Sequence, residues 1–243
     1  MAATSATRDA ANRDEFLDGV RRLVGVEPEV LSGAEEAATS FLGATWDLGD
    51  LDVGGGGPLL VFDIGGGSTE LIMGRPGAAE APKAVSVDVG SVRLTERHVS
   101  GDPPGQAEID AVAADASSHL AGAAARVGWP GPGGAGAVIG VAGTVTTVTA
   151  VSLGLTAYDP SRVHRTTLTL DQVRRTTARL CAMTVAAKAA IPVMPPGRED
   201  VIAAGALILR SLFEVLGLEA ITVSETDILD GILLGLARRM GAG

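Results

Sequence analysis

Hydrophobic residues near the start of the chain recur at the spacing of an amphipathic helix. The apolar stripe consists of Phe16, Val20, Leu23 and Val24. Asn12 stands where an N-cap residue is expected, with Glu15 three residues later, and Gly25 can end the helix in a left-handed conformation. We therefore predict a helix over 12–24 and a short strand over 26–31.

A second helix is predicted from Ser32. Ser32 and Glu35 have the spacing of a capping box, in which each side chain bonds the backbone N–H of the other residue. Beyond this helix, four glycines at 54–57 are followed by Pro58. This composition indicates a loop or a domain boundary.

Two apolar strands are predicted directly after this boundary. They cover 59–64 and 69–73, and only four residues separate them. Such a short connection is typical of a β-hairpin. We expect residues 84–89 to form a third strand of the same sheet.

Helical and strand-like segments alternate through the rest of the chain. Predicted helices cover 107–127, a segment opening at Thr144, 171–183 with Asp171 as its cap, 197–216 and 227–240. Predicted strands cover 138–142 and 220–223. This alternation is typical of an α/β protein.

Composition supports a soluble α/β fold with an aliphatic core. Hydrophobic residues make up 46% of the chain and aromatic residues only 3%. The longest uncharged run, about 135–158, is rich in Gly and Thr and predicts a strand, a turn and a helix, not a membrane span. Residues 1–8 lack the pattern of a signal peptide. We therefore expect no membrane partner.

Charge narrows the range of ligands. The net charge of −10 argues against binding nucleic acid through a general basic surface. A smaller polyanion would have to be bound locally, by backbone amides, a few cationic side chains or a metal ion. Cys181 is the only cysteine, so an intramolecular disulfide is excluded and a cytoplasmic location is expected. We expect Cys181 to be a small core residue.

The segment 62–71 is the most informative of the chain. Asp63 lies at the end of the predicted strand, and Gly65, Gly66, Gly67 and Ser68 follow it. Glycine amides can approach an anion closely, the serine adds a hydroxyl donor, and the aspartate can hold Mg²⁺ that bridges to phosphate. The alternative is a hairpin turn that only needs a positive φ, for which one or two glycines would suffice.

A second glycine turn occupies 140–147, between a predicted strand and a predicted helix. Its amides could meet a phosphate or a nucleotide, and a tight packing turn explains the pattern equally well. The three histidines, His98, His119 and His164, are too scattered along the sequence to predict a metal site.

These motifs resemble the exopolyphosphatase and guanosine pentaphosphate phosphohydrolase (Ppx/GppA) family. Residues 63–71 are similar to its second phosphate motif. Segments similar to other family motifs follow the expected order at 3–12, 32–37, 88–96, 140–144 and 230–232. The resemblance implies the two-domain fold of the acetate kinase, sugar kinase, Hsp70 and actin superfamily, which is ribonuclease H-like. Its active site lies in the cleft between two α/β domains.

The resemblance also implies roles for individual residues. Glu36 falls at the catalytic base, which directs water at the terminal phosphate, whereas Glu35 is occupied by the capping box. Asp63 falls at the aspartate linked to Mg²⁺. The positions implied in phosphate binding are Gly65, Gly66, Gly67, Ser68, Arg8 and Arg93. For Arg93, a solvated arginine at a strand end is an equally good interpretation.

The chain departs from the family at its beginning. The family starts with a strand–turn–strand that cradles the other side of the phosphates, and nothing similar precedes Thr4. We therefore expect residues 1–53 to be an incomplete first domain on which the closing helix, 227–241, packs. Residues 58–226 would form the second domain. On this interpretation the chain alone would have poor stability and little or no hydrolytic activity.

Several functions stay open from the sequence. The resemblance favours Mg²⁺-dependent release of terminal orthophosphate from inorganic polyphosphate. Its nearest rival is removal of a phosphate from guanosine pentaphosphate, and a third reading is a truncated protein that binds such ligands without catalysis. An ATP-dependent kinase of the same fold is disfavoured by 4–12 and 32–37. We also expect that the chain can pair with a second copy.

Overall fold

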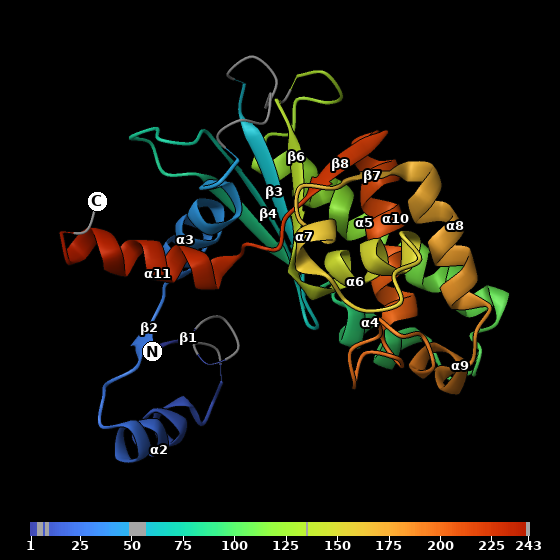
Figure 1. The fold of residues 1–243 in the computed structure, drawn as a ribbon, viewed down its shortest axis with the longest axis horizontal. Coiled ribbons are helices and arrows are strands. Elements are labelled where there is room, and N and C mark those ends of the chain that lie inside the picture. Colours follow the sequence, from blue (N-terminus) through green and yellow to red (C-terminus); the bar gives the residue numbers. More distant parts are fainter. Residues whose placement is uncertain (4–6, 8–9, 49–56, 135, 242–243) are drawn as a thin grey trace.

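The structure is a computed structural model that describes every residue except 4–6, 8–9, 49–56, 135 and 242–243. Its centre is a six-stranded sheet with the order β5-β4-β3-β6-β8-β7 (Figure 1). The strands are β3 (Leu59–Ile64), β4 (Thr69–Gly74), β5 (Lys83–Val87), β6 (Val138–Val141), β7 (Thr167–Thr169) and β8 (Ala220–Val223). The molecule is therefore an α/β protein, as predicted.

Strand pairing divides the sheet into two halves. Strands β3, β4 and β5 form an antiparallel meander, so the predicted hairpin and third strand are confirmed. Strand β6 runs parallel to β3, and β8 runs parallel to β6. Because parallel strands end at the same edge of a sheet, the turns that follow β3 and β6 lie side by side.

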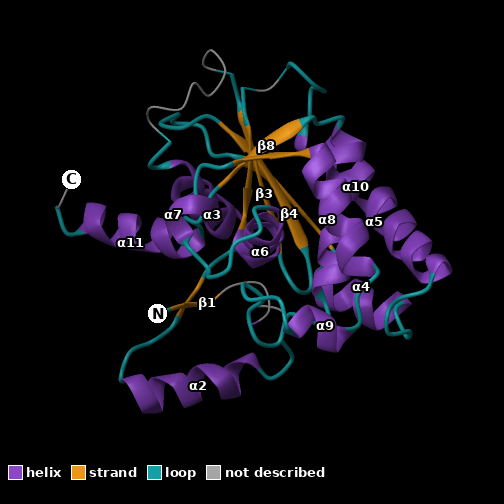
Figure 2. Cartoon of the chain, turned by 45° about the vertical axis from the view of Figure 1, so that its right-hand side comes forward, coloured by secondary structure: helices purple, strands orange, loops and turns teal. Residues whose placement is uncertain are grey.

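The alternation of side chains along β3 separates the two faces of the sheet. Leu60, Phe62 and Ile64 point into the main core, which is covered by α5 (Gln106–Val127), α8 (Leu170–Cys181) and α10 (Ile202–Leu216) (Figure 2). Leu59 and Val61 point to the opposite face, against helix α3 (Gly33–Thr45). Asp63 has the same parity as these two residues and so belongs to the α3 face.

Helix α3 begins as the sequence predicts and packs on a second helix. The Ser32 side chain accepts from Glu35 N–H, and the Glu35 side chain completes the capping box. Helix α11 (Ile228–Arg239) lies against α3 at very short range. A Cβ added at Gly43 would be 1.7 Å from Asp227 O, and one added at Gly231 would be 2.0 Å from Thr39 O.

A small unit at the start of the chain lies apart from the main sheet (Figure 1). Strands β1 (Ala2–Ala3) and β2 (Glu29–Val30) form a two-stranded parallel sheet, and α2 (Arg13–Val24) connects them. Gly25 ends α2 in the left-handed conformation, as predicted, whereas the Asn12 side chain makes no capping hydrogen bond. No residue of α2 is buried. The predicted strand over 26–31 is reduced to two residues.

The remaining helices differ from the sequence expectations in informative ways. They are α4 (Ser91–His98), α6 (Ala142–Ser152), α7 (Pro160–Val163) and α9 (Val185–Ala189). Helices α4, α7 and α9 and strand β7 are not predicted from the pattern. Helix α8 is capped by Thr169 together with Gln172, not by Asp171. Helix α10 begins five residues later than predicted.

The structure also places the single cysteine and shows the character of the helices. Cys181 is buried, as expected. Across the described residues, no helix combines the length and the apolar character needed to cross a bilayer.

Candidate functional site

The glycine turn between β3 and β4 is held by helix α4. The N–H of Gly65 donates to Ser68 O at 3.0 Å and closes the hairpin. The N–H groups of Ser91 and Val92 donate to the carbonyl oxygens of Gly65 and Gly66 at 3.0 and 2.9 Å. The first turn of α4 therefore occupies the carbonyls of the glycine turn.

The glycines of this turn are not required by backbone conformation. None of Gly65, Gly66 and Gly67 has a positive φ, so the interpretation as a left-handed turn is wrong. Gly66 and Gly67 are exposed, and their N–H groups have no acceptor in the described part of the chain. Without side chains to cover them, these two amides are accessible to an anion.

Asp63 and Glu36 line one cavity of about 300 Å³ on the α3 face of the sheet. Glu70 joins them, because it is the antiparallel partner of Asp63 across the hairpin and points to the same face. Ser86 Oγ donates to Glu70 Oε1 at 2.7 Å. Two strands and one helix thus bring three carboxylates to the wall of one cavity.

The carboxylates in this cavity affect one another's protonation. Burial raises the pKa of Asp63 to about 7, and the charges of Glu70, Asp227 and Glu36 act in the same direction. Burial also raises the pKa of Glu70, although hydrogen bonds from Ser86 and Ser68 oppose this effect. The cavity therefore holds more negative charge than its surroundings compensate.

The second glycine turn faces the first across another cavity of about 310 Å³. Gly65 and Gly66 line one side of it, and Ala142, Gly143 and Arg198 line the other. Ala142 has a φ of 66°, which is a strained conformation for a residue with a Cβ. Such strain is common where a backbone is shaped for a ligand.

Arg198 lies directly on the second turn. A Cβ at Gly143 would be 1.7 Å from one terminal nitrogen of the Arg198 guanidinium. A side chain at position 143 would therefore displace the Arg198 guanidinium from this place. Sequence reasoning missed Arg198, because residues 197–201, which were predicted to begin the helix, instead form an irregular segment before α10 that contains Arg198. It also missed Glu70, which strand register relative to Asp63 could have identified.

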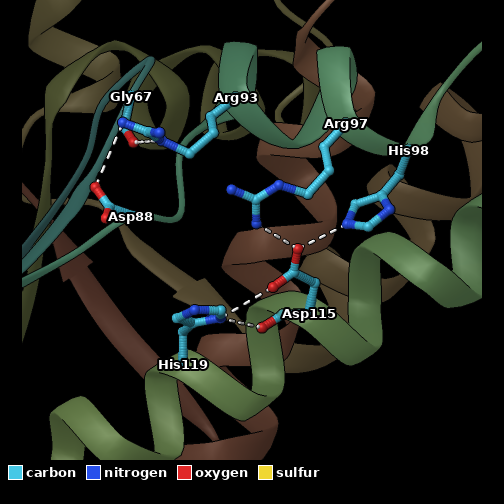
Figure 3. A network of polar contacts seen from close by, with 7 residues as sticks. All are labelled: Gly67, Asp88, Arg93, Arg97, His98, Asp115 and His119. Atoms are coloured by element: carbon cyan, nitrogen blue, oxygen red, sulfur yellow. Dashed lines mark hydrogen bonds and ion pairs between the residues drawn. The ribbon is translucent and has the colours of Figure 1, made fainter.

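Arg93 lies on α4, so its interpretation as a strand-end residue is corrected. Its Nε donates to Gly67 O at 2.6 Å, and its guanidinium forms an ion pair with Asp88 at 3.4 Å (Figure 3). The side chain is 42% exposed. Arg93 thus stabilises the glycine turn, and part of its guanidinium stays accessible to solvent. Arg8, the other predicted arginine, lies outside the described residues.

A third cavity, of about 410 Å³, adjoins the second and shares Gly143 and Arg198 with it. Its other lining residues include Tyr158, Pro192 and Met194. The Tyr158 hydroxyl hydrogen-bonds to Glu225, and burial together with this bond raises the pKa of Tyr158 to about 12. The lining of this cavity is mainly apolar, and Arg198 is its one cationic side chain.

Metal-binding geometry is limited. In the ranges that the structure describes, no group of three or more His, Cys, Asp or Glu side chains is arranged to hold a metal ion. His98 and His119 nevertheless lie close together in space, because both contact the carboxylate of Asp115.

Comparison with known proteins gives consistent matches over nearly the whole chain. Residues 1–240 match the Ppx/GppA phosphatase family. Exopolyphosphatase 2 of Mycobacterium tuberculosis is 40% identical over 98% of this chain and 74% of its own length. The crystal structure of an exopolyphosphatase-like protein, 40% identical, superimposes with a TM-score of 0.87 over 98% of this chain and 77% of that one. A Ppx/GppA family member from Aquifex aeolicus, 27% identical, gives 0.83 over 98% and 74%.

Proposed function

The chain belongs to the Ppx/GppA phosphatase family, and from this premise we propose that it releases terminal orthophosphate from inorganic polyphosphate. Membership makes it a hydrolase of phosphoanhydride bonds with the actin-like ATPase fold. The named relatives that act as exopolyphosphatases favour polyphosphate as the substrate. The further assignment of residues is our proposal and rests on the site geometry.

One observation carries the assignment. Glu36 and Asp63 line the same cavity, and Asp63 is two residues before a turn whose Gly66 and Gly67 amides are accessible. An acid that can accept a proton therefore shares a cavity with Asp63, whose strand leads directly into donors that can hold phosphate oxygens. Phosphoanhydride hydrolysis needs this combination of charge stabilisation and a positioned base.

In the proposed reaction, the amides of Gly66 and Gly67 hold the terminal phosphate, with Ser68 and Arg93 beside them. Glu36 accepts a proton from a water molecule while the water oxygen forms a bond to the terminal phosphorus. The bridging P–O bond breaks, and its electron pair stays on the oxygen of the shortened chain. Arg198, between the two turns, would bind phosphates further along the chain.

The residues around Asp63 fit a divalent cation. Its raised pKa reflects burial and the nearby charges of Glu70, Asp227 and Glu36, which a cation would relieve. Mg²⁺ prefers oxygen ligands and commonly binds one or two carboxylates, with water and substrate phosphates completing its shell. We therefore propose that Asp63, with Glu70 nearby, holds Mg²⁺. When bound, the ion would neutralise part of the phosphate charge.

The adjacent residues Glu35 and Glu36 offer a matched test of the catalytic base. Glu36→Gln should lower kcat for phosphate release from polyphosphate by about 10²–10⁴-fold, because an amide cannot accept the proton. Glu35→Gln should stay close to the unsubstituted chain, since glutamine also completes a capping box. Release of orthophosphate is measured with and without Mg²⁺, beside unfolding curves for each variant.

Three outcomes would contradict the proposal. If Glu36→Gln hydrolyses polyphosphate at the original rate, Glu36 is not the base. If both substitutions reduce activity equally, the effect comes from helix α3 as a whole. If the unsubstituted chain binds polyphosphate without releasing phosphate, it is a binding protein and not an enzyme.

The third cavity favours guanosine pentaphosphate as a second candidate substrate. Its apolar lining, with Tyr158 and Met194, suits a nucleoside better than a string of phosphates. It also opens beside Arg198, so a nucleoside seated there would direct its phosphates toward the glycine turns. Tyr158→Ala should then lower kcat/KM for guanosine pentaphosphate by about tenfold and leave that for polyphosphate within twofold. An equal effect on both substrates would contradict this assignment.

A further inference from the structure

Helix α4 binds all three carbonyl groups of the glycines in the glycine turn. Its first-turn amides bind the carbonyls of Gly65 and Gly66, and the Arg93 side chain binds that of Gly67. Gly90, just before α4, is pressed on the same turn, since a Cβ there would be 2.3 Å from Gly66 O. Any change in the position of α4 therefore changes the position of the amides proposed to hold phosphate.

The C-terminal end of α4 contacts a carboxylate from α5. Arg97 Nη1 and His98 Nε2 contact the same oxygen of Asp115 at 2.7 and 2.6 Å (Figure 3). The Asp115 side chain is only 15% exposed. Burial alone would raise the pKa of Asp115, but the hydrogen bonds from His98 and Arg97 and the nearby charges outweigh it and lower the pKa. Asp115 is therefore ionised at neutral pH while it contacts both side chains of α4.

The contact with Asp115 matters because α4 itself buries few apolar side chains. Of its eight residues, only Ser91 and Leu94 are buried. Helix α4 also contacts α10, but a two-turn helix with one buried leucine needs a further contact near its C-terminal end to fix its direction. The bonds to Asp115, one turn beyond Leu94, supply a second fixed point and so define the direction of the helix.

We propose that Asp115 is a positioning residue for the phosphate-binding turn, acting through Arg97, His98 and helix α4. Its effect on catalysis rests on the proposed function, whereas the mechanical coupling between Asp115 and residues 65–68 does not. Asp115 itself touches neither substrate nor reacting atoms in this proposal. It keeps the glycine amides in the geometry that grips a terminal phosphate.

The structure offers an internal control for this proposal. His119 Nδ1 contacts Asp115 Oδ1 at 2.9 Å and the Asp115 carbonyl oxygen at 3.0 Å. Both residues belong to α5, so this contact does not connect α5 to α4. Loss of His119 should weaken interactions of Asp115 without releasing α4.

The test compares hydrogen exchange at the turn in four variants. Asp115→Ala and the double variant Arg97→Ala/His98→Ala should make the hydrogen-bonded amides of Gly65, Ser91 and Val92 exchange about tenfold faster, because both free α4 from the turn. Asp115→Asn, which keeps an acceptor oxygen, should lie between these and the unsubstituted protein. His119→Ala should exchange like the unsubstituted protein. Thermal unfolding of each variant shows that it is folded, and the double variant remains informative if Asp115→Ala is not.

Kinetics with polyphosphate provide the second readout. Variants that free α4 should raise KM about fivefold and leave kcat within about twofold, since binding of phosphate is lost and Glu36 is untouched. Unchanged exchange at Gly65, Ser91 and Val92 in the double variant overturns the proposal, as does an equal effect of His119→Ala. Faster exchange without a change in KM overturns the positioning role. If the unsubstituted protein releases no phosphate while exchange responds as expected, the proposed function fails and the coupling stands.

Discussion

The proton on Asp63 links the chemistry of the site to the stability of the fold. An aspartate in the unfolded chain has a pKa of 3.8, whereas burial and three neighbouring carboxylates raise that of Asp63 to about 7. Between these values the folded protein binds a proton that the unfolded chain releases. Stability contributed by this group is therefore fully present below pH 3.8 and is lost progressively as the pH rises to about 7.

Replacing Asp63 should remove this pH dependence. In the absence of divalent cations, Asp63→Asn should be more stable than the unsubstituted chain at pH 8, by at most about 4 kcal/mol, and this difference should shrink to less than half at pH 5. Thermal and urea unfolding at pH 5, 6, 7 and 8 measure the difference. Glu219→Gln, which removes one exposed carboxylate, is the control and should show no such trend. Equal stability of Asp63→Asn and the unsubstituted chain at pH 8 would contradict the expectation.

Candidate residues within one short segment can be proposed from the sequence, whereas residues brought together by the fold cannot. Asp63 and the glycine turn are proposed from the chemistry of one segment, and Glu36 from its resemblance to a family motif; their roles stay predictions. Glu70 depends on strand register, and Arg198 depends on the turn that precedes α10. His98 and His119 are 21 positions apart in the sequence, yet they meet at Asp115 because α4 packs on α5.

At the scale of single elements, helix caps and apolar periodicity predict most helices and strands. The capping box of α3, the end of α2 at Gly25 and the β3–β4 hairpin are confirmed. Helix α4 escapes such prediction, because its burial of one leucine leaves no apolar stripe and Val92 is exposed. Its contacts with the glycine turn at one end and with Asp115 at the other are made by the fold and leave no pattern in the sequence.

The cap of α3 should matter for activity as well as for stability. Ser32→Ala removes a cap and should cost about 1 kcal/mol of stability. Because Glu36 lies one turn from this cap, we also expect kcat to fall several-fold. Thr169→Ala removes the equivalent cap of α8, which lies away from the carboxylate cavity, and should cost similar stability without affecting kcat. A similar fall in kcat for both variants would show that only global stability is involved.

At the scale of the whole molecule, the carboxylate cavity depends on how α11 is seated on α3. Ile228 lines this cavity, and Asp227 contributes to the raised pKa of Asp63. The close contact between the two helices depends on two glycines, Gly43 and Gly231. A Cβ at either position would overlap backbone atoms of the facing segment. The sequence shows Gly231 and Gly235 at the spacing of small residues, and only the structure distinguishes their environments.

Gly231 and Gly235 therefore make a matched pair for testing this interface. Gly231→Ala would place its Cβ 2.0 Å from Thr39 O, so we expect α11 to be displaced and stability to fall by about 1–3 kcal/mol. Gly235→Ala meets nothing closer than 3.8 Å and should be neutral or up to about 1 kcal/mol more stable, since alanine favours helix. Urea unfolding of both variants decides the matter. A stable Gly231→Ala would mean that α11 is not packed on α3 in solution.

The alternating side chains of β3 restrict how this protein can change length. Phe62 points into the main core and Asp63 into the carboxylate cavity, and each neighbour along the strand follows the same two-residue rule. Inserting or deleting one residue within 59–63 would exchange their places, burying an acid in the apolar core and turning a phenyl ring toward the proposed phosphate site. Natural variants should therefore gain or lose residues in this strand only in pairs, and absorb single-residue changes in the loops at its ends.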